Sequence, residues 1–315
     1  MHVLELDHVR KRYGQTVAVD DLSFRVEPGL VTGFLGPNGS GKSTTMKILL
    51  DLASADHGWA TIGGSRYREL GDPPRTVGVI LEPNAFHPAR SGRNHLRVLA
   101  DGAGIPGDRI DEMLLMVGLE DSADRMVGTY SLGMRQRLGL AAAVLGDPPV
   151  LVLDEPANGL DPEGIRWLRN LLRSRAANGN TVFVSSHLLA EVEHLADQVV
   201  VINHGRLVTT GAISDLRKVG TSVRTPSPEQ LTDILKAADC AVQVRTDGSL
   251  LVRGLTTAEI GDRAFAGGIS LHELSPHVGS LEDLFLGWTG SEETITATPA
   301  KKETATPAKK EKVLT

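Results

Sequence analysis

The sequence predicts an α/β fold, and two features of its 315 residues carry that prediction. Short apolar runs of about strand length recur at residues 30–35, 77–81, 150–153 and 181–185, as is typical of parallel strands that are buried on both faces. Segments with helical spacing of apolar residues lie between the runs, most clearly at 163–177, where a helix can cross from one parallel strand to the next. We therefore expect a sheet flanked by helices.

The N-terminal half adds two parts to this core. From residue 3 to residue 26 the apolar residues alternate about a turn at 13–15, which predicts an antiparallel β subdomain. A helix is expected after Lys42, followed by a short strand at 60–62. Between about residues 84 and 146 the apolar residues take helical spacing, with glycines between the segments. This region is expected to be a helical insertion.

The C-terminal third is expected to form a separate unit. Ser, Thr and Pro accumulate from residue 220, which places a boundary between a first domain at 1–219 and a small α+β accessory domain at 220–290. Strands are expected in the accessory domain at 241–245 and 249–253. Beyond it, the segment TATPAKKE occurs twice in succession, and this low-complexity tail, 291–315, lacks the apolar residues needed to fold.

The composition excludes several classes of function. A net charge of -6 and a pI near 5.9 give no general basic character, so no nucleic-acid partner is expected. The single cysteine, Cys240, excludes an intramolecular disulfide framework and fits a reducing compartment. No stretch approaches the roughly 20 apolar residues that cross a bilayer, and the N-terminus does not read as a secretory signal. We expect a cytoplasmic protein that reaches a membrane only through a partner.

A glycine-rich stretch after the first apolar run fits the phosphate-binding pattern G-x-x-x-x-G-K-[ST]. Its glycines let backbone N–H groups turn inward around phosphate oxygens, Lys42 adds a positive charge, and the Ser43 hydroxyl can bind Mg²⁺. A plain Gly-rich turn is the alternative. The order of strand, loop and helix favours a P-loop NTPase core, in which the nucleotide-binding residues are Gly36, Pro37, Asn38, Gly39, Ser40, Gly41, Lys42, Ser43 and Thr44.

Catalytic side chains are expected where two later apolar runs end. Asp154 would hold Mg²⁺, directly or through water, and Glu155 would act as the general base that polarises water for attack on a γ-phosphate. A strand capped by a turn would also place two carboxylates here. His187 would contact the γ-phosphate and orient Glu155, although a lone histidine is more often structural or solvated. The expected catalytic residues are thus Lys42, Glu155 and His187.

A Ser/Gly turn opens the apolar helix at 138–145. Ser131 in this turn is a natural helix N-cap. The same geometry makes an anion site, because the Ser131 hydroxyl, the Gly133 N–H group and the helix N-terminus can together bind a γ-phosphate offered from outside the subunit.

The order and spacing of these motifs resemble the ATP-binding cassette of ABC transporters over residues 3–217. The resemblance implies that Tyr13 stacks on adenine, that Glu82 takes the Q-loop position and can meet Mg²⁺, and that Asp161 belongs to the D-loop, here Asn158-Gly159-Leu160-Asp161. Without it, Tyr13 would be interpreted as a half-buried strand or turn aromatic and Asp161 as a helix N-cap.

Two motifs depart from the family pattern. The usual signature Leu-Ser-Gly-Gly-Gln is Tyr-Ser-Leu-Gly-Met at 130–134, and the usual Q-loop glutamine is Glu82. These variants, with the segment at 280–286, are similar to the drug and antibiotic export branch, whose membrane subunits are of the ABC-2 type. The resemblance implies an ATPase that uses ATP and Mg²⁺, pairs head to tail with a second copy of itself, and powers export of a drug, antibiotic or other small hydrophobic compound through a separate permease at the inner face of the cell membrane.

Two alternatives belong to other functional classes. A soluble ABC ATPase that acts on nucleic acid or ribosomes usually carries two cassettes, long coiled coils or zinc-binding cysteines, and the sequence shows none of these. A nucleotide-binding regulator with little turnover is disfavoured because both Glu155 and His187 are present.

Overall fold

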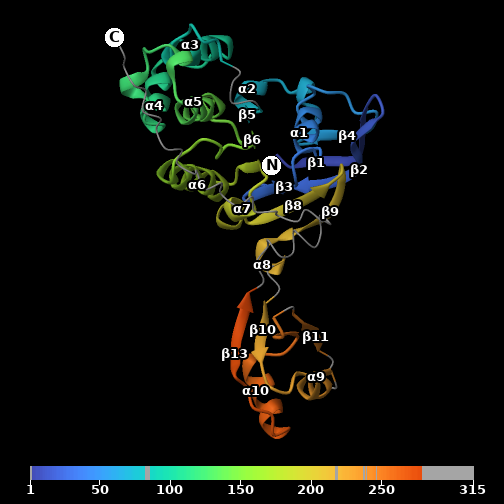
Figure 1. Ribbon diagram of the computed structural model, residues 1–315. Coiled ribbons are helices and arrows are strands. Elements are labelled where there is room, and N and C mark those ends of the chain that lie inside the picture. Colours follow the sequence, from blue (N-terminus) through green and yellow to red (C-terminus); the bar gives the residue numbers. More distant parts are fainter. Residues whose placement is uncertain are drawn as a thin grey trace, which may run out of the picture.

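The largest sheet of the protein has six strands in the order β5-β6-β7-β3-β8-β9 (Figure 1). The computed structural model describes residues 2–81, 86–216, 219–236, 238, 240–245 and 247–278. Neighbouring strands from β5 to β8 are parallel, whereas β9 pairs antiparallel with β8. The α/β class is confirmed, with strands β3 (Val31–Leu35), β5 (Val77–Ile80), β6 (Val150–Leu153), β7 (Thr181–Ser186), β8 (Gln198–Asn203) and β9 (Arg206–Ala212).

This sheet is buried on both faces. Successive residues of one strand enter different hydrophobic clusters, as Phe183 and Val184 of β7 do. The cluster that contains Phe183 includes α1 (Lys42–Leu49), and the cluster that contains Val184 includes α6 (Pro162–Ala177) and α7 (Leu189–Leu195). Burial on two faces explains why these strands read as continuous apolar runs.

A second, antiparallel sheet has three strands in the order β2-β1-β4. It consists of β1 (Leu4–Tyr13), β2 (Thr16–Val26) and β4 (His57–Ile62), and its inward residues share a cluster with α1. The predicted antiparallel β subdomain is confirmed. Strand β4 begins before the expected range of 60–62, because His57 and Trp59 also pair with β1.

The helical insertion is also present. Its helices α3 (Gly92–Gly102), α4 (Asp108–Met116) and α5 (Leu132–Val144) bury their apolar faces in the same cluster as α6. Shorter turns are α2 (Pro73–Thr76) and the 3-10 segments η1 (Tyr67–Glu69), η2 (Glu120–Ser122) and η3 (Val127–Thr129). None of the helices in the described part of the chain combines the length and the apolar composition that a membrane span requires.

The C-terminal unit is a four-stranded antiparallel sheet in the order β11-β12-β10-β13 with its own hydrophobic cluster. The Ser-, Thr- and Pro-rich segment forms β10 and leads into α9, and the two expected strands correspond to β11 and β12. The predicted tail, 291–315, lies outside the described residues. The elements are α8 (Ile213–Leu216), β10 (Val219–Arg224), α9 (Pro228–Lys236), β11 (Ala241–Val244), β12 (Leu250–Arg253), α10 (Thr257–Ala266) and β13 (Glu273–Val278).

Candidate nucleotide site

The phosphate loop connects the end of β3 to the start of α1, and its glycines are required by close backbone contacts. Gly41 precedes the helix with φ of 106°, in the left-handed region, and a Cβ there would lie 2.3 Å from the Ala18 carbonyl oxygen. A Cβ on Gly36 would lie 2.6 Å from the Ile202 carbonyl oxygen. Side chains at these positions would push the loop away from β2 and β8, so the glycines serve both the conformation and the close packing.

Lys42 folds back over this loop. Its Nζ donates hydrogen bonds to the carbonyl oxygens of Gly36 at 2.6 Å and Pro37 at 3.2 Å, and the residue is only 6% exposed. Burial lowers the pKa of the Lys42 ammonium, while the nearby carboxylates of Glu155 and Asp154 act to raise it. An anion bound in the loop would supply the counter-charge that backbone carbonyls provide only as dipoles.

Two further features of the loop concern Ser40. One is its side-chain oxygen, and the other is the turn that holds its backbone. The buried Ser40 Oγ has no hydrogen-bond partner among the described residues, which fits a site that receives an oxygen-rich ligand. The turn between β8 and β9 holds the loop in place, because the Gly205 N–H donates to the Ser40 carbonyl at 2.9 Å and the Asp20 N–H donates to the Gly205 carbonyl at 2.9 Å. The sequence prediction missed this role of Gly205.

Ser43 and Asp154 meet at the first turn of α1. The Ser43 hydroxyl donates to Asp154 Oδ2 at 2.7 Å. A hydroxyl and a carboxylate fit Mg²⁺, which typically takes few protein oxygens and completes its shell with water and substrate phosphates. Among the described residues no group of three or more His, Cys, Asp or Glu could hold a metal ion. Glu82, expected as a third ligand, lies outside the described residues.

Glu155 and His187 are in direct contact, although 32 positions separate them in the sequence. Glu155 Oε2 lies 2.8 Å from His187 Nδ1, and both side chains are partly exposed, at 21% and 35%. Glu155 has a φ of 49°, in the left-handed region. A non-glycine residue there carries strain of order 1 kcal/mol, and such strain is often found at functional sites. The side chains of Glu155 and His187, two of the three expected catalytic residues, therefore lie together at a solvent-accessible position.

Ser185, which the sequence prediction did not single out, bridges the two adjacent carboxylate residues. Its hydroxyl donates to Asp154 Oδ1 and accepts a hydrogen bond from the Glu155 N–H at 2.9 Å. The residue is fully buried at the end of β7. One polar side chain thus fixes the Asp154 carboxylate and the backbone of Glu155 together. The signal for it was the polar pair Ser185-Ser186 at the end of an otherwise apolar strand.

Ser131 begins α5, as the N-cap interpretation expected. Its Oγ accepts a hydrogen bond from the Met134 N–H at 3.2 Å. Gly133 packs so closely against the loop after β6 that a Cβ there would lie 2.7 Å from the Gly159 carbonyl oxygen. No hydrogen bond joins Ser131 or Gly133 to the phosphate loop within the described part of this chain. These two residues line a surface pocket of about 410 Å³ with Asp161.

The loop after Glu155 is tied to α5 by two further side chains. The buried Gln136 donates from Nε2 to the Pro156 carbonyl at 2.9 Å. Asp161 caps α6 by accepting from the Gly164 N–H at 2.9 Å, and Arg137 donates to the same Asp161 oxygen at 3.3 Å. The Gly164 hydrogen bond, with the Arg137 charge, holds the pKa of Asp161 below its usual value. The expected N-cap role of Asp161 is therefore present in the structure.

Tyr13 ends β1 as an exposed aromatic ring. It is 52% exposed, and the Lys11 Nζ lies 5.3 Å from its ring centroid. An approximately half-exposed ring at the end of a strand also agrees with the alternative interpretation, a half-buried strand or turn aromatic. The ring face is available for stacking on a planar ligand.

The fold and this geometry define a P-loop nucleotide-binding protein, and comparison with known proteins makes the class more specific. Residues 19–158 match the family model described as ABC transporter, and residues 220–282 match a second model described as a domain of unknown function, DUF8746. The chain is 40% identical over 220 residues to the bacitracin transport ATP-binding protein BcrA of Enterococcus faecalis, covering 69% of this chain and 71% of that protein.

Two longer matches extend through most of the C-terminal unit. The chain is 37% identical to the ABC transporter ATP-binding protein YhcH of Bacillus subtilis, covering 91% of this chain and 96% of that protein. It is 36% identical to the Nod factor export ATP-binding protein I of Burkholderia pseudomallei, with coverage of 92% and 97%. Among solved structures, an ATP binding subunit of an ABC transporter aligns with a TM-score of 0.63 and 28% identity, covering 68% of this chain and 92% of that one.

The chain belongs to the ATP-binding proteins of ABC transporters. It is an ATPase subunit whose substrate is ATP, as the phosphate loop and its resemblance to the family predicted.

Proposed function

We propose that this ATPase powers the export of an antibiotic, a drug or another small hydrophobic compound through a separate membrane subunit of the ABC-2 type. The observation that carries the catalytic part is the continuous network from Ser43 through Asp154 and Ser185 to Glu155 and His187. The export part is supported by relatives named for bacitracin transport, lantibiotic transport and Nod factor export.

In this proposal the phosphate loop binds the β- and γ-phosphates of ATP. Lys42 would exchange its carbonyl partners for phosphate oxygens, and the buried Ser40 hydroxyl would gain a partner. Ser43 and Asp154 would hold Mg²⁺, which when bound neutralises charge that develops on the phosphates. The exposed ring of Tyr13 would stack on the adenine.

Glu155 is the proposed general base. Its carboxylate would accept a proton from the attacking water, and His187 would orient that carboxylate while facing the γ-phosphate. The left-handed backbone conformation of Glu155, which the Ser185 hydroxyl stabilises, sets the direction in which the Glu155 side chain points from the edge of the sheet. Pre-set positions of this kind lower the reorganisation needed during the reaction.

The proposed site is completed by a second copy of the chain. Ser131 and Gly133 stand at an exposed helix N-terminus beside the pocket that also contains Asp161. A helix N-terminus with a serine hydroxyl is suited to a γ-phosphate. In a head-to-tail dimer, Ser131 and Gly133 of one copy would close over ATP bound in the loop of the other. A solved dimeric cassette of a bacterial ABC transporter shares this fold, with a TM-score of 0.61 and 21% identity.

Ser185 should affect turnover more than nucleotide binding. Ser185→Ala removes one hydrogen bond to a charged carboxylate and one from the Glu155 backbone, so we expect kcat to fall about tenfold or more with a smaller change in KM for ATP. Ser185→Thr keeps the hydroxyl and should recover most of the loss. Steady-state ATPase kinetics at several Mg²⁺ concentrations measure both effects.

The control for Ser185 is Ser174→Ala, which removes an exposed hydroxyl from α6. Thermal unfolding midpoints show whether a loss of activity comes from misfolding or from a displaced Glu155 side chain. A folded Ser185→Ala protein with the kcat of the wild type would contradict the positioning role.

The helical insertion offers the proposed contact with the membrane subunit. Val98 and Leu99 of α3 are 50% and 40% exposed, and both line a groove of about 380 Å³ between the insertion and β5. Exposed apolar residues beside a groove are typical of a surface that receives a partner helix. The chain would in this way lie at the inner face of the membrane through its partner.

This contact predicts a selective loss of assembly. Replacing Val98 and Leu99 by Asp should abolish co-purification with the proposed ABC-2 type subunit, while the ATPase rate of the isolated chain stays within about twofold because surface changes are mild. Leu115→Asp, at a 67% exposed position on α4, is the matched control and should still assemble. Recovery of the wild-type chain with RNA or ribosomes, and without a membrane protein, would instead favour the soluble class of ABC ATPase.

A further inference from the structure

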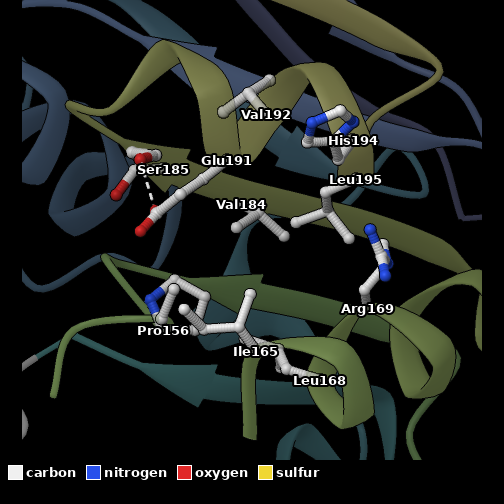
Figure 2. Close-up of a pocket in the computed structure, with 12 residues that line it drawn as sticks. Pro156, Ile165, Leu168, Arg169, Val184, Ser185, Glu191, Val192, His194 and Leu195 are labelled. Atoms are coloured by element: carbon white, nitrogen blue, oxygen red, sulfur yellow. Dashed lines mark hydrogen bonds between the residues drawn. The ribbon is translucent and has the colours of Figure 1, made fainter. Parts of the chain in front are cut away.

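A separate cavity of about 220 Å³ lies between α6, β7 and α7 (Figure 2). Its wall is formed almost wholly by carbon atoms. The apolar residues that line it are Pro156, Ala157, Ile165, Leu168, Val184, Val192 and Leu195. None of the phosphate-loop residues lines this cavity, although Ser185, which bridges Asp154 and Glu155, does.

The size and lining of the cavity fit a small organic molecule better than water. An apolar cavity of about 150 Å³ in another protein stays dry and binds benzene, so a cavity of this volume can take one aromatic ring with a short chain. Water needs several polar partners, which Leu168, Val184 and Leu195 do not supply.

The charged side chains at the two ends of the cavity determine at which end a negatively charged group of a ligand is favoured. Figure 2 shows Arg169 and His194 at one end and Glu191 at the other. Arg169 makes no hydrogen bond or ion pair with any described residue, whereas the Glu191 carboxylate already accepts from the Ser186 hydroxyl at 3.0 Å. The unpaired guanidinium favours a carboxylate at its own end, and Glu191 disfavours one at the opposite end.

The cavity shares its wall with the two segments that carry the catalytic pair. Pro156 directly follows Glu155 on one side, and Ser186, which also lines the cavity, directly precedes His187 on the other. A ligand that fills the space between these segments would favour the arrangement in which Glu155 and His187 touch, because binding stabilises whichever arrangement it fits.

We propose that this cavity is a regulatory site for a small apolar carboxylate, whose apolar body packs between α6 and α7 and whose carboxylate pairs with Arg169. The ligand raises the rate of ATP hydrolysis by holding Glu155 against His187. The binding part of the proposal stands on the cavity alone, whereas the effect on rate rests on the proposed roles of Glu155 and His187.

Binding is tested on the full-length chain without nucleotide. Benzoate, 3-phenylpropanoate and octanoate are titrated by calorimetry and by ligand-observed NMR, with 3-phenylpropanol as the uncharged counterpart. We expect saturable binding of at least one carboxylate, at least tenfold tighter than the alcohol. Arg169→Gln should remove this difference, and Arg169→Lys should restore part of it. Arg166→Gln, at an exposed position on the same helix outside the cavity, should bind as the wild type does.

A second variant tests the location. Ile165→Phe fills the cavity from α6 and should abolish binding of both the acid and the alcohol. Equal binding by wild type and Ile165→Phe, unchanged carboxylate preference in Arg169→Gln, or no saturable binding of any of the three carboxylates would overturn the site.

The effect on rate is measured separately. At a saturating concentration of the bound carboxylate, ATP hydrolysis should rise at least twofold in the wild type and stay unchanged in Ile165→Phe. Saturated binding without a change in rate would overturn the regulatory role. Undiminished hydrolysis by Glu155→Gln would overturn the proposed base and leave the binding result intact, so the two failures are distinguishable.

Discussion

Glu155→Gln should leave ATP binding intact and reduce turnover by about 10² to 10⁴-fold, the range that general base catalysis usually contributes. Glutamine keeps the size of the side chain and its ability to contact His187, but it cannot accept the proton of the attacking water at neutral pH. The phosphate loop, Lys42 and the Ser43 and Asp154 pair are unchanged. Equilibrium binding of a fluorescent ATP analogue and single-turnover release of phosphate measure the two effects.

The matched control for Glu155 is Glu229→Gln, which removes an exposed carboxylate from α9 and should hydrolyse ATP at the wild-type rate. Hydrolysis by Glu155→Gln at a rate equal to the wild type would remove Glu155 as the base. A variant that lost ATP binding as well would show that the carboxylate supports Lys42 rather than the chemistry, since the two groups interact electrostatically.

The meeting of Asp154, Glu155 and His187 could be predicted because each follows a parallel strand. The carboxyl ends of neighbouring parallel strands lie at one edge of a sheet, and β6 and β7 are neighbours. The local sequence pattern was therefore enough to predict that these side chains lie close together. The same reasoning applies to the phosphate loop, since β3 lies directly beside β7.

The supports of the site could not be predicted, because each joins segments that no local pattern connects. The Gly205 turn reaches Ser40 from a later hairpin. Gln136, two positions after the variant signature at 130–134, is buried and donates a hydrogen bond to the Pro156 carbonyl. Each residue is a common polar or small residue in its own stretch, so only the folded neighbourhood reveals its role.

The C-terminal sheet was predicted only in part for a related reason. β11 and β12 form a local hairpin with a recognisable turn, whereas β10 pairs with β13, which lies about fifty positions further along the chain and contains Pro276. A proline within a run normally argues against a strand. Here β13 is an edge strand of the sheet, where proline is tolerated, and β10 itself is composed largely of Gly, Ser, Thr and Val.

Ser131 and Asp161 show that one residue can satisfy two interpretations. Both cap helices in the structure of a single chain, as local propensity expects. A cap leaves the helix N-terminus open to an incoming anion, so capping and phosphate binding by a second copy are compatible. The distinction between them must therefore come from an experiment that uses two copies.

Mixing two inactive variants should restore activity if the nucleotide site is shared between copies. Lys42→Ala removes the cation of the phosphate loop. Ser131→Asp keeps a good N-cap for α5 and places a negative charge where the γ-phosphate would arrive. Each variant alone should have little ATPase activity. Because random pairing makes half of the dimers mixed, and each mixed dimer has one intact site, an equal mixture should recover about one quarter of the wild-type rate.

Ser131→Asn is the matched control for charge, because asparagine has the shape and capping ability of aspartate without its negative charge. It should retain far more activity than Ser131→Asp, and both proteins should unfold at similar temperatures. If the mixture stays as inactive as its components, or if Ser131→Asp alone hydrolyses ATP at the wild-type rate, then each chain completes its own site and the head-to-tail arrangement is wrong. Recovery only on mixing would mean that Ser131 acts on ATP held by the other copy, because neither chain then contains a complete set of groups.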